Sequence, residues 1–231
     1  FQLKDDDSGE YSIEIDPRAT DDQTIKQLRE LGFNRISLGV QDFDPAVQQA
    51  VNRIQSEAET FAVLEAARKH GFRSSSIDLI YGLPKQSVAS FSVTLDKILT
   101  VSPDRFSIFN YAHLPARFKT QRQINDADMP SAEVKLDILQ MIIQRLLDEG
   151  YVYIGMDHFA KPDDELAIAQ RENKLYRNFQ GYSTHSDCDL IGFGITSIGR
   201  VADSYVQNVK DLASYDTLIS RGALPVFKGL L

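Results

Sequence analysis

Short apolar runs alternate with longer amphipathic stretches along this chain, and the alternation predicts its elements. Runs rich in β-branched and aromatic residues are expected to be strands at 12–16, 36–42, 74–80 and 105–110. Between these runs, apolar residues recur at helical spacing, which predicts helices within 20–31, 45–53, 56–71 and 88–99. This β-α-β-α order predicts a parallel sheet with right-handed crossovers.

Residues at the helix ends support these limits. Thr20 with Gln23, and Ser56 with Glu59, have the spacing of a capping box. Ser131 is expected to begin a long amphipathic helix that ends before residue 150, and a strand should follow at 151–156. The pattern then loosens, with a helix expected at 162–170, partly extended chain at 177–183, a glycine-punctuated apolar run at 189–199 and a last helix at 209–221.

Polar side chains gather at the C-terminal ends of the predicted strands. Glu14, Gln41, Asp78 and Asn110 lie at or near these ends, and Arg53 follows a short helix. In parallel α/β folds the active site forms at this end of the sheet. Carboxylates accept hydrogen bonds from hydroxyls or an amine, and arginine binds a carboxylate through two donors. The set predicts a small-molecule site; the alternative for each residue alone is that it only caps a turn between strand and helix.

Composition narrows the class of protein. The net charge of -8 argues against nucleic-acid binding, which needs a surplus of lysine and arginine. No apolar run approaches the roughly 18 residues that a membrane-spanning helix requires. The single cysteine, Cys188, excludes a disulfide within the chain and suits a reducing cytoplasm, so a cytoplasmic location is expected.

The residue types allow two other kinds of site, a metal site and an acid-base pair. Asp157 and His158, followed by acids at 163–165, are the residue types of a metal site, but their spacing matches no zinc pattern, and a hydrogen-bonded loop is favoured. Asp78 and His113 could act as acid and base in an unrelated barrel lyase or hydrolase. No nucleophile-base pair names a reaction.

At these same positions the chain closely resembles the oxygen-independent coproporphyrinogen III oxidases of the radical S-adenosylmethionine superfamily. The matching motifs are EIDPR (14–18), FNRISLGVQDF (33–43), VNR (51–53), IDLIYGLPKQ (77–86), PDRFSIFNYAHLP (103–115), GMDHFAKPDDELAIAQ (155–170) and RNFQGYST (177–184). The last two motifs are the most specific to this enzyme. Tyr176, where the family would have His, is a small departure.

The resemblance implies a fold, a cofactor site and a reaction. The fold would be an open (β/α)6 TIM-like barrel with additional C-terminal α/β elements. The residues that would contact S-adenosylmethionine are Glu14, Gln41, Arg53, Asp78, Ala112, Phe179, Gln180 and Ile198. A [4Fe–4S] cluster would cleave this cofactor to a radical, and two propionates of coproporphyrinogen III would become the vinyl groups of protoporphyrinogen IX. No catalytic side chain is identified, because the cofactor carries the hydrogen abstraction.

The chain departs from the family in its cysteines. The cluster needs the pattern CxxxCxxC, and this sequence has only Cys188. Its ligands are therefore expected upstream of Phe1, together with the first two barrel strands. The expected domains are 1–150, a partial barrel holding strands three to six of the family, and 151–231, a truncated C-terminal extension that covers the substrate and cofactor cavity.

Partners also follow from the resemblance. They are the coproporphyrinogen III substrate and an electron donor protein, with no nucleic acid and no membrane, and the family expectation is a monomer. By itself, the chain is expected to be inactive. The alternative function is that of a haem-trafficking relative in the same superfamily, against which the RNFQGY and GMDHFA motifs argue.

Overall fold

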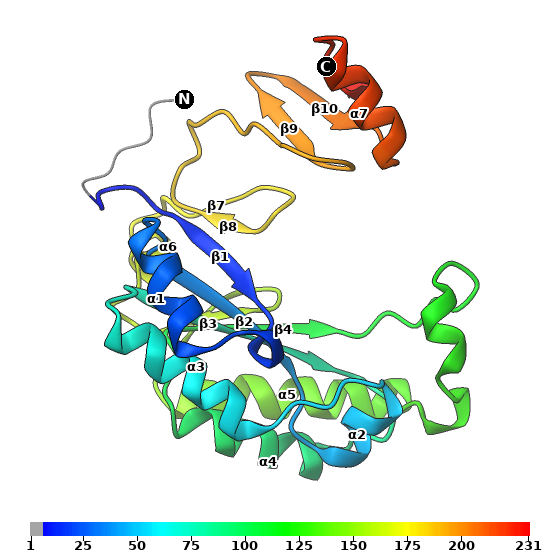
Figure 1. Ribbon diagram of the computed structural model, residues 1–231. Coiled ribbons are helices and arrows are strands. Elements are labelled where there is room, and N and C mark those ends of the chain that lie inside the picture. Colours follow the sequence, from blue (N-terminus) through cyan, green and yellow to red (C-terminus); the bar gives the residue numbers. More distant parts are fainter. Residues whose placement is uncertain (1–6) are drawn as a thin grey trace. The chain divides into compact units, whose positions relative to one another are not determined.

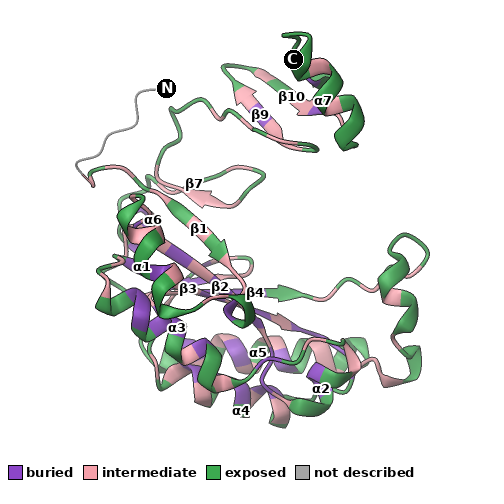
Figure 2. Cartoon of the chain, viewed as in Figure 1, coloured by how far each residue is buried: buried purple, intermediate pink, exposed green. Residues whose placement is uncertain are grey.

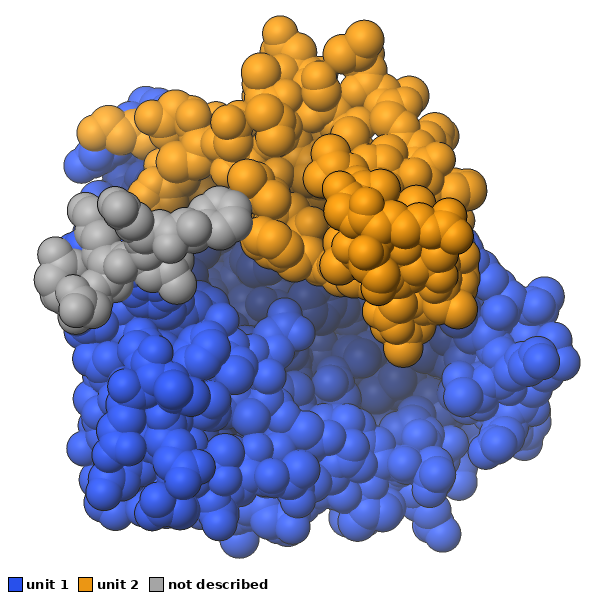
Figure 3. Space-filling view, turned by 45° about the horizontal axis from the view of Figure 1, so that its top comes forward, with its two compact units in different colours: residues 1–173 blue, residues 174–231 orange. Residues whose placement is uncertain are grey.

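The computed structural model describes residues 7–231 and contains two compact units. The first unit ends at Asn173, and the second runs from Lys174 to Leu231 (Figure 3). This division falls later than the expected boundary at residue 150, because the strands and helix of 152–171 pack with the first unit. Each unit is described by itself below.

A six-stranded sheet forms the centre of the first unit (Figure 1). Its strands, in spatial order, are β1 (Ser12–Ile15), β2 (Arg35–Gln41), β3 (Ser74–Tyr81), β4 (Arg105–Asn110), β6 (His158–Ala160) and β5 (Val152–Gly155). The first four strands pair in parallel. The α/β fold with a mostly parallel sheet, expected from the alternating pattern, is confirmed.

The strand β6 was not expected from the sequence. It pairs antiparallel with both β4 and β5, so that His158 lies opposite Ser107. A three-residue strand shows too little alternation to be recognised locally, and it forms because the edge of β4 offers free backbone groups. The strand expected at 151–156 is confirmed as β5.

The helices of the first unit follow the predicted limits closely. They are α1 (Asp22–Glu30), α2 (Pro45–Ala50), α3 (Glu57–Lys69), α4 (Val88–Leu99), α5 (Ala132–Asp148) and α6 (Glu165–Arg171). The capping box of Ser56 and Glu59 is confirmed. The box expected at Thr20 is wrong, because Asp21 caps α1 and the Thr20 hydroxyl donates to the backbone oxygen of Asp16 instead.

One face of the parallel sheet packs against helices α3, α4 and α5 (Figures 1 and 2). Residues alternate between buried and half-buried along β2, so Ile36, Leu38 and Val40 point into this core. Phe91 and Ile138 reach the same core from α4 and α5 and are fully buried. The alternate residues of β2 and β3 point to the opposite face, which leaves that face for polar side chains.

The second unit consists of short strands and one helix. It contains β7 (Tyr176–Arg177), β8 (Tyr182–Ser183), β9 (Ile198–Val201), β10 (Ser204–Asn208), α7 (Leu212–Ser220) and β11 (Val226–Leu230). The strands β11, β10 and β9 form an antiparallel sheet in that order, and β7 pairs with β8. Among residues 7–231, no helix has the length and apolar character needed to cross a membrane.

Replacement of Leu38 by alanine tests the core. Leu38 is fully buried at the centre of β2, and its loss leaves a cavity between sheet and helices. We expect Leu38→Ala to lower the free energy of unfolding by about 2–5 kcal/mol, measured by urea denaturation followed by circular dichroism. The matched control is Leu31→Ala, since Leu31 is 77% exposed after α1, and its effect should stay within about 0.5 kcal/mol. Equal losses in both variants would contradict this assignment of the core.

Candidate functional site

Two carboxylates lie on the sheet face opposite the helices. Glu14 on β1 stands opposite Ser37 of β2 in the parallel register. The Ser37 hydroxyl is 3.1 Å from each oxygen of the Asp78 carboxylate on β3. Asp78 in turn stands opposite Ser107 of β4, which also hydrogen-bonds to it. The sheet therefore aligns Glu14, Ser37, Asp78 and Ser107 in a polar row across four neighbouring strands.

The environment of Asp78 favours its protonated form. The pKa of Asp78 is raised to about 6, mainly by burial and to a smaller extent by the negative charge of Glu14, while the hydrogen bonds from Ser37 and Ser107 oppose the rise. A carboxylate held partly out of water has a strong affinity for hydrogen-bond donors. The row is therefore suited to a ligand that brings hydroxyl or ammonium groups.

Gln41 lies at an irregularity at the end of β2. The pairing of β2 with β3 shifts between Gly39 and Gln41, and Gln41 has a φ of 70°, in the left-handed region. Non-glycine residues adopt this conformation at a cost, and such residues cluster at functional sites. A Cβ atom on Gly39 would lie 3.0 Å from Gln41 Nε2 and 3.4 Å from Arg53 Nη2, so a larger residue at position 39 would crowd both side chains.

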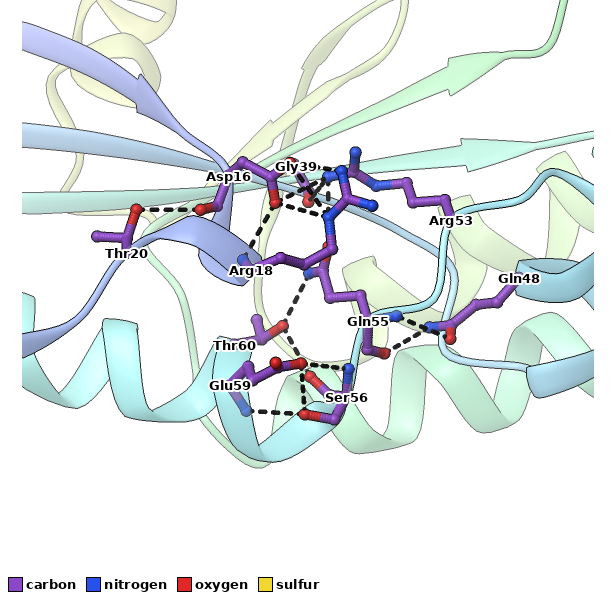
Figure 4. A network of polar contacts seen from close by, with 10 residues as sticks. All are labelled: Asp16, Arg18, Thr20, Gly39, Gln48, Arg53, Gln55, Ser56, Glu59 and Thr60. Atoms are coloured by element: carbon purple, nitrogen blue, oxygen red, sulfur yellow. Dashed lines mark hydrogen bonds and ion pairs between the residues drawn. The ribbon is translucent and has the colours of Figure 1, made fainter.

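Arg53 is held beside Gln41 by the end of β2. Its Nη2 donates to the Gly39 carbonyl oxygen at 2.8 Å and to Gln55 Oε1 at 3.3 Å, and lies 3.6 Å from Asp16 Oδ1 (Figure 4). Its Nε is buried and has no hydrogen-bond partner among the described residues. A buried donor without an acceptor is costly, so a ligand acceptor at this position would be favourable.

A network of amides fixes the loop that carries Arg53 (Figure 4). Gln48 Nε2 donates to the backbone oxygens of Asp42 and Gln55, and the backbone nitrogen of Gln55 donates to Gln48 Oε1. Gln55 Nε2 reaches Thr60 Oγ1 on α3 at 2.9 Å. Because Gln48, Gln55 and Thr60 are buried, these bonds set the position of the loop after α2 firmly.

A cavity of about 300 Å³ opens next to these residues. Its lining residues come from the ends of β2 and β3, from the loop after α2 and from the chain after β4; they are Gln41, Ala50, Val51, Asn52, Arg53, Ile80, Leu83, Tyr111, Thr120, Gln121, Gln123 and Ile124. The predicted residues Gln41 and Arg53 thus share one cavity at the C-terminal ends of the strands. This volume is at the lower end of the range for small-molecule sites.

Asn110 is the last residue of β4, and Ala112 follows it by two residues. Both are exposed, and the backbone oxygen of Ala112 accepts a hydrogen bond from Gln121 Nε2 at 3.0 Å. Ala112 directly follows Tyr111 of the cavity wall. The predicted residues of the first unit therefore all lie at or near the same end of the sheet; they are Glu14, Gln41, Arg53, Asp78 and Ala112.

The other predicted residues belong to the second unit. Phe179 and Ile198 line a separate cavity of about 260 Å³, with residues of β10 and β11. Gln180 is exposed, and its backbone nitrogen donates to Asn178 Oδ1 at 2.8 Å. The second unit thus brings Phe179 and Ile198 together.

Several residues of the site were missed by sequence reasoning. Ser37 and Ser107 bind Asp78, and Gln55 holds Arg53, yet none was predicted. The period of two along β2 and β4 places both serines on the polar face, and this signal could have found them. Gln55 has no such signal, because its role depends on the path of a loop.

Asp42 has a structural role, although it adjoins Gln41. It is buried, and its carboxylate accepts hydrogen bonds from Thr94, Gln86 and the backbone nitrogen of Asp44. Gln86 also donates to the backbone oxygen of Ile80. Asp42 therefore joins the end of β2 to the chain after β3 and to α4, so that only Gln41 of this pair faces the cavity.

The structure does not support the two other kinds of site, the metal site and the acid-base pair. Among residues 7–231, no three His, Cys, Asp or Glu side chains are grouped as a metal site would need. His113 contacts Tyr111 and Asp126 through its two ring nitrogens, whereas the recorded hydrogen bonds of Asp78 go to serines. An acid-base pair of Asp78 and His113 is therefore not favoured.

Comparison with known proteins gives concordant matches. The model of the radical SAM superfamily matches residues 2–98. The chain is 56% identical over 230 residues to the oxygen-independent coproporphyrinogen III oxidase of Pseudomonas aeruginosa, and the match covers 100% of this chain and 50% of that protein. It is 54% identical over 213 residues to the protein of the same name from Thermostichus vulcanus, covering 92% of this chain and 66% of that protein.

A solved structure matches equally well. Coproporphyrinogen III oxidase (HemN) from Escherichia coli, described as a radical SAM enzyme, superposes with a TM-score of 0.94 at 52% identity. The match covers 97% of this chain and 52% of the Escherichia coli chain. The chain spans about half the length of most of the relatives it matches.

The raised pKa of Asp78 predicts a pH-dependent stability. The pKa is about 6 in the folded state against an ordinary 3.8, so the native state holds this proton more tightly than the unfolded chain. This tighter proton binding stabilises the native state fully below about pH 4, and the stabilisation is lost as the pH rises through about 6. Asp78→Asn removes the charge, so its free energy of unfolding should exceed that of wild type by about 1–3 kcal/mol at pH 8, and the difference should vanish near pH 4.

Urea titrations at several pH values measure this difference. Asp96→Asn is the matched control, because Asp96 is an exposed acid on α4 in a surface ion pair with Arg145. Its effect should stay below about 1 kcal/mol and change little over this range. An Asp78→Asn variant that is less stable than wild type at pH 8 would show that the ionised carboxylate is not under strain.

Proposed function

The chain is related by sequence and by fold to the oxygen-independent coproporphyrinogen III oxidases, and we propose that it forms the S-adenosylmethionine-binding part of such an enzyme. The observation that carries this proposal is the gathering of Glu14, Asp78, Gln41 and Arg53 at the strand ends, in a chain 52% identical to a solved oxidase. The whole enzyme is an oxidoreductase of porphyrin and haem biosynthesis. It converts two propionates of coproporphyrinogen III to vinyl groups by oxidative decarboxylation, giving protoporphyrinogen IX.

The site chemistry is compatible with S-adenosylmethionine. The carboxylates of Glu14 and Asp78 would accept hydrogen bonds from ribose hydroxyls or the amino group, and the half-buried position of Asp78 strengthens such bonds. The unsatisfied Nε of Arg53 and the amide of Gln41 would bind further polar groups of the cofactor. Ala112, which is exposed beside the cavity, completes the proposed contacts of the first unit.

The residues of the second unit are included in the proposal on separate grounds. Phe179 and Ile198 line an apolar cavity suited to a flat ring, and Gln180 is exposed next to Phe179. We propose that these residues complete the cofactor pocket, and that 151–231 acts as an extension over it. We also propose that β1 to β4 are strands three to six of an open (β/α)6 barrel.

The cofactor supplies chemistry that side chains lack. Protein acids and bases do not remove hydrogen from an unactivated carbon, whereas reductive cleavage of S-adenosylmethionine at a [4Fe–4S] cluster provides a carbon radical that does. The part of Glu14, Asp78 and Arg53 is to bind and orient the cofactor, so that its reactive carbon faces the substrate. No catalytic residue is therefore assigned among the acids of this chain.

The cluster itself does not fit the residues of this chain. Such clusters are held by several cysteine thiolates, and the sequence has one cysteine, Cys188, which is exposed. Ligands for the cluster must come from outside these residues. The proposal includes an electron donor protein, a cytoplasmic location and a monomeric state, and no observation favours the haem-trafficking alternative.

Loss of the Asp78 charge tests the cofactor site. We expect Asp78→Asn to weaken binding of S-adenosylmethionine about tenfold to a hundredfold at pH 8, because a charge-assisted hydrogen bond is replaced by a neutral one. Isothermal titration calorimetry measures the dissociation constant. Asp96→Asn, with the same chemical change on the outer side of α4, should bind as wild type does. Unchanged affinity in Asp78→Asn would remove the main support for the proposed site.

The cysteine count predicts the outcome of reconstitution. After anaerobic incubation with iron and sulfide, the 231-residue chain should show no absorbance of an iron–sulfur cluster and form no protoporphyrinogen. Adding a Cys188→Ser variant provides the control, since it should behave identically. If the 231-residue chain alone held a stable cluster and converted coproporphyrinogen, the ligand assignment would be wrong.

A further inference from the structure

A basic segment follows β4 at the edge of the cavity. We define it as residues 113–124, and it carries Arg117, Lys119 and Arg122, all exposed. Within the described part of the chain, none of these three side chains forms an ion pair with an acid. Unpaired cations concentrated in a protein of net charge -8 create a local positive potential. Such a potential selects an anionic ligand over a neutral one.

The basic segment is anchored rather than loosely exposed. Gln121 donates to the Ala112 carbonyl and accepts from the backbone nitrogen of Leu114, at 3.0 and 2.6 Å. Arg122 Nε donates to the Pro115 carbonyl at 3.0 Å, and residues 119–123 form a short 3₁₀ helix. These bonds hold the backbone of the segment in one conformation. The backbone positions that carry the cations are therefore defined, beyond the end of β4.

The same segment supplies part of the cavity wall. Thr120, Gln121, Gln123 and Ile124 line the cavity that contains Gln41 and Arg53. Lys119 and Arg122 are sequence neighbours of these lining residues. A ligand that extends beyond the cavity would meet the cations directly. Because about 300 Å³ is small for a tetrapyrrole, such a ligand has to extend past it.

Apolar side chains accompany the cations. Leu114 and Phe118 are each 46% exposed, and the guanidinium of Arg117 lies 5.6 Å from the ring centroid of Phe118. An apolar surface bordered by cations matches a flat apolar macrocycle that bears carboxylates. We propose that the basic segment binds the propionate carboxylates of the tetrapyrrole substrate through Arg117, Lys119 and Arg122.

This inference rests on the proposed function and names the substrate-binding part of the same site. An acidic electron-transfer protein would also be attracted by three cations. The shared wall favours the small anion, because the cations are chain neighbours of residues that line the proposed cofactor cavity, and the substrate has to meet the cofactor there. The two partners are separated by the experiment.

The test compares two triple variants of the full 231-residue chain. In the first, Arg117, Lys119 and Arg122 are changed to glutamine (R117Q/K119Q/R122Q). The matched control is K26Q/K69Q/R145Q, which removes the same charge from two exposed positions on α1 and α3 and a half-buried one on α5. The probes are coproporphyrin III, the fluorescent oxidised form of the substrate, and its tetramethyl ester, which lacks carboxylates. Binding is followed by fluorescence anisotropy at low ionic strength.

We expect the first variant to bind coproporphyrin III at least about tenfold more weakly than wild type, and the ester with little change. The control variant should bind both probes as wild type does. Added salt should weaken the binding of coproporphyrin III to wild type more than to the first variant. Affinity for S-adenosylmethionine, measured in parallel, should be the same in all three proteins.

Two results would overturn the inference. The first is equal affinity of wild type and R117Q/K119Q/R122Q for coproporphyrin III. The second is a wild-type chain that does not bind coproporphyrin III. In both cases the S-adenosylmethionine titration judges the proposed function separately. If the first variant kept its affinity for coproporphyrin III and lost affinity for flavodoxin, an acidic electron-transfer protein, the basic segment would be a protein-docking surface instead.

Discussion

The parallel pairing of β2 with β3 is the constraint on which the rest of this structure depends. Both strands bury alternate residues against the helices, so their pairing directs every second side chain to the opposite face. The register places Gly39 opposite Asp78 and brings the Ser37 hydroxyl to the Asp78 carboxylate. A slip of one residue would turn Asp78 toward the apolar core. Burial on one side thus orders the polar groups on the other.

The end of β2 adds a local departure from regular pairing. The left-handed conformation of Gln41 and the absence of a side chain at Gly39 allow Arg53 to donate to the strand end. Buried amides hold the loop in this position, while the buried carboxylate of Asp42 joins the end of β2 to α4. The cost of the strained residue is offset by a network of hydrogen bonds, which is common where a site must be held rigid.

Charge is distributed unevenly around this end of the sheet. The acids Glu14 and Asp78 occupy the polar face, whereas the cations of the basic segment lie beyond the end of β4. The acids suit a ligand that brings hydrogen-bond donors, as the proposed cofactor does, and the cations suit a ligand that brings carboxylates, as the proposed substrate does. Separation of charge of this kind orients a ligand as well as binding it, because the reversed orientation places like charges together.

Much of the fold could be predicted from sequence. The four parallel strands, the helices between them and the capping box at Ser56 follow from local periodicity and hydrogen-bonding preference. Glu14, Gln41, Arg53 and Asp78 could be proposed from the sequence because polar residues at the ends of parallel strands lie at the same edge of a sheet. Local pattern failed where a residue had two possible partners: Thr20 and Asp21 both suit a helix cap, and only the folded backbone decides between them.

Tertiary structure alone decided the remaining features. It buried Asp42 and exposed Gln41 to the cavity, although the two are adjacent. It added β6 to the edge of β4 and placed Thr120, Gln121, Gln123 and Ile124 in the wall of a cavity formed by distant strands. These outcomes depend on which groups meet across long stretches of chain, and the free energy of such contacts is absent from any local segment. Periodicity therefore determined the elements and one face of the site, whereas packing determined which neighbouring polar groups became structural and which stayed available to a ligand.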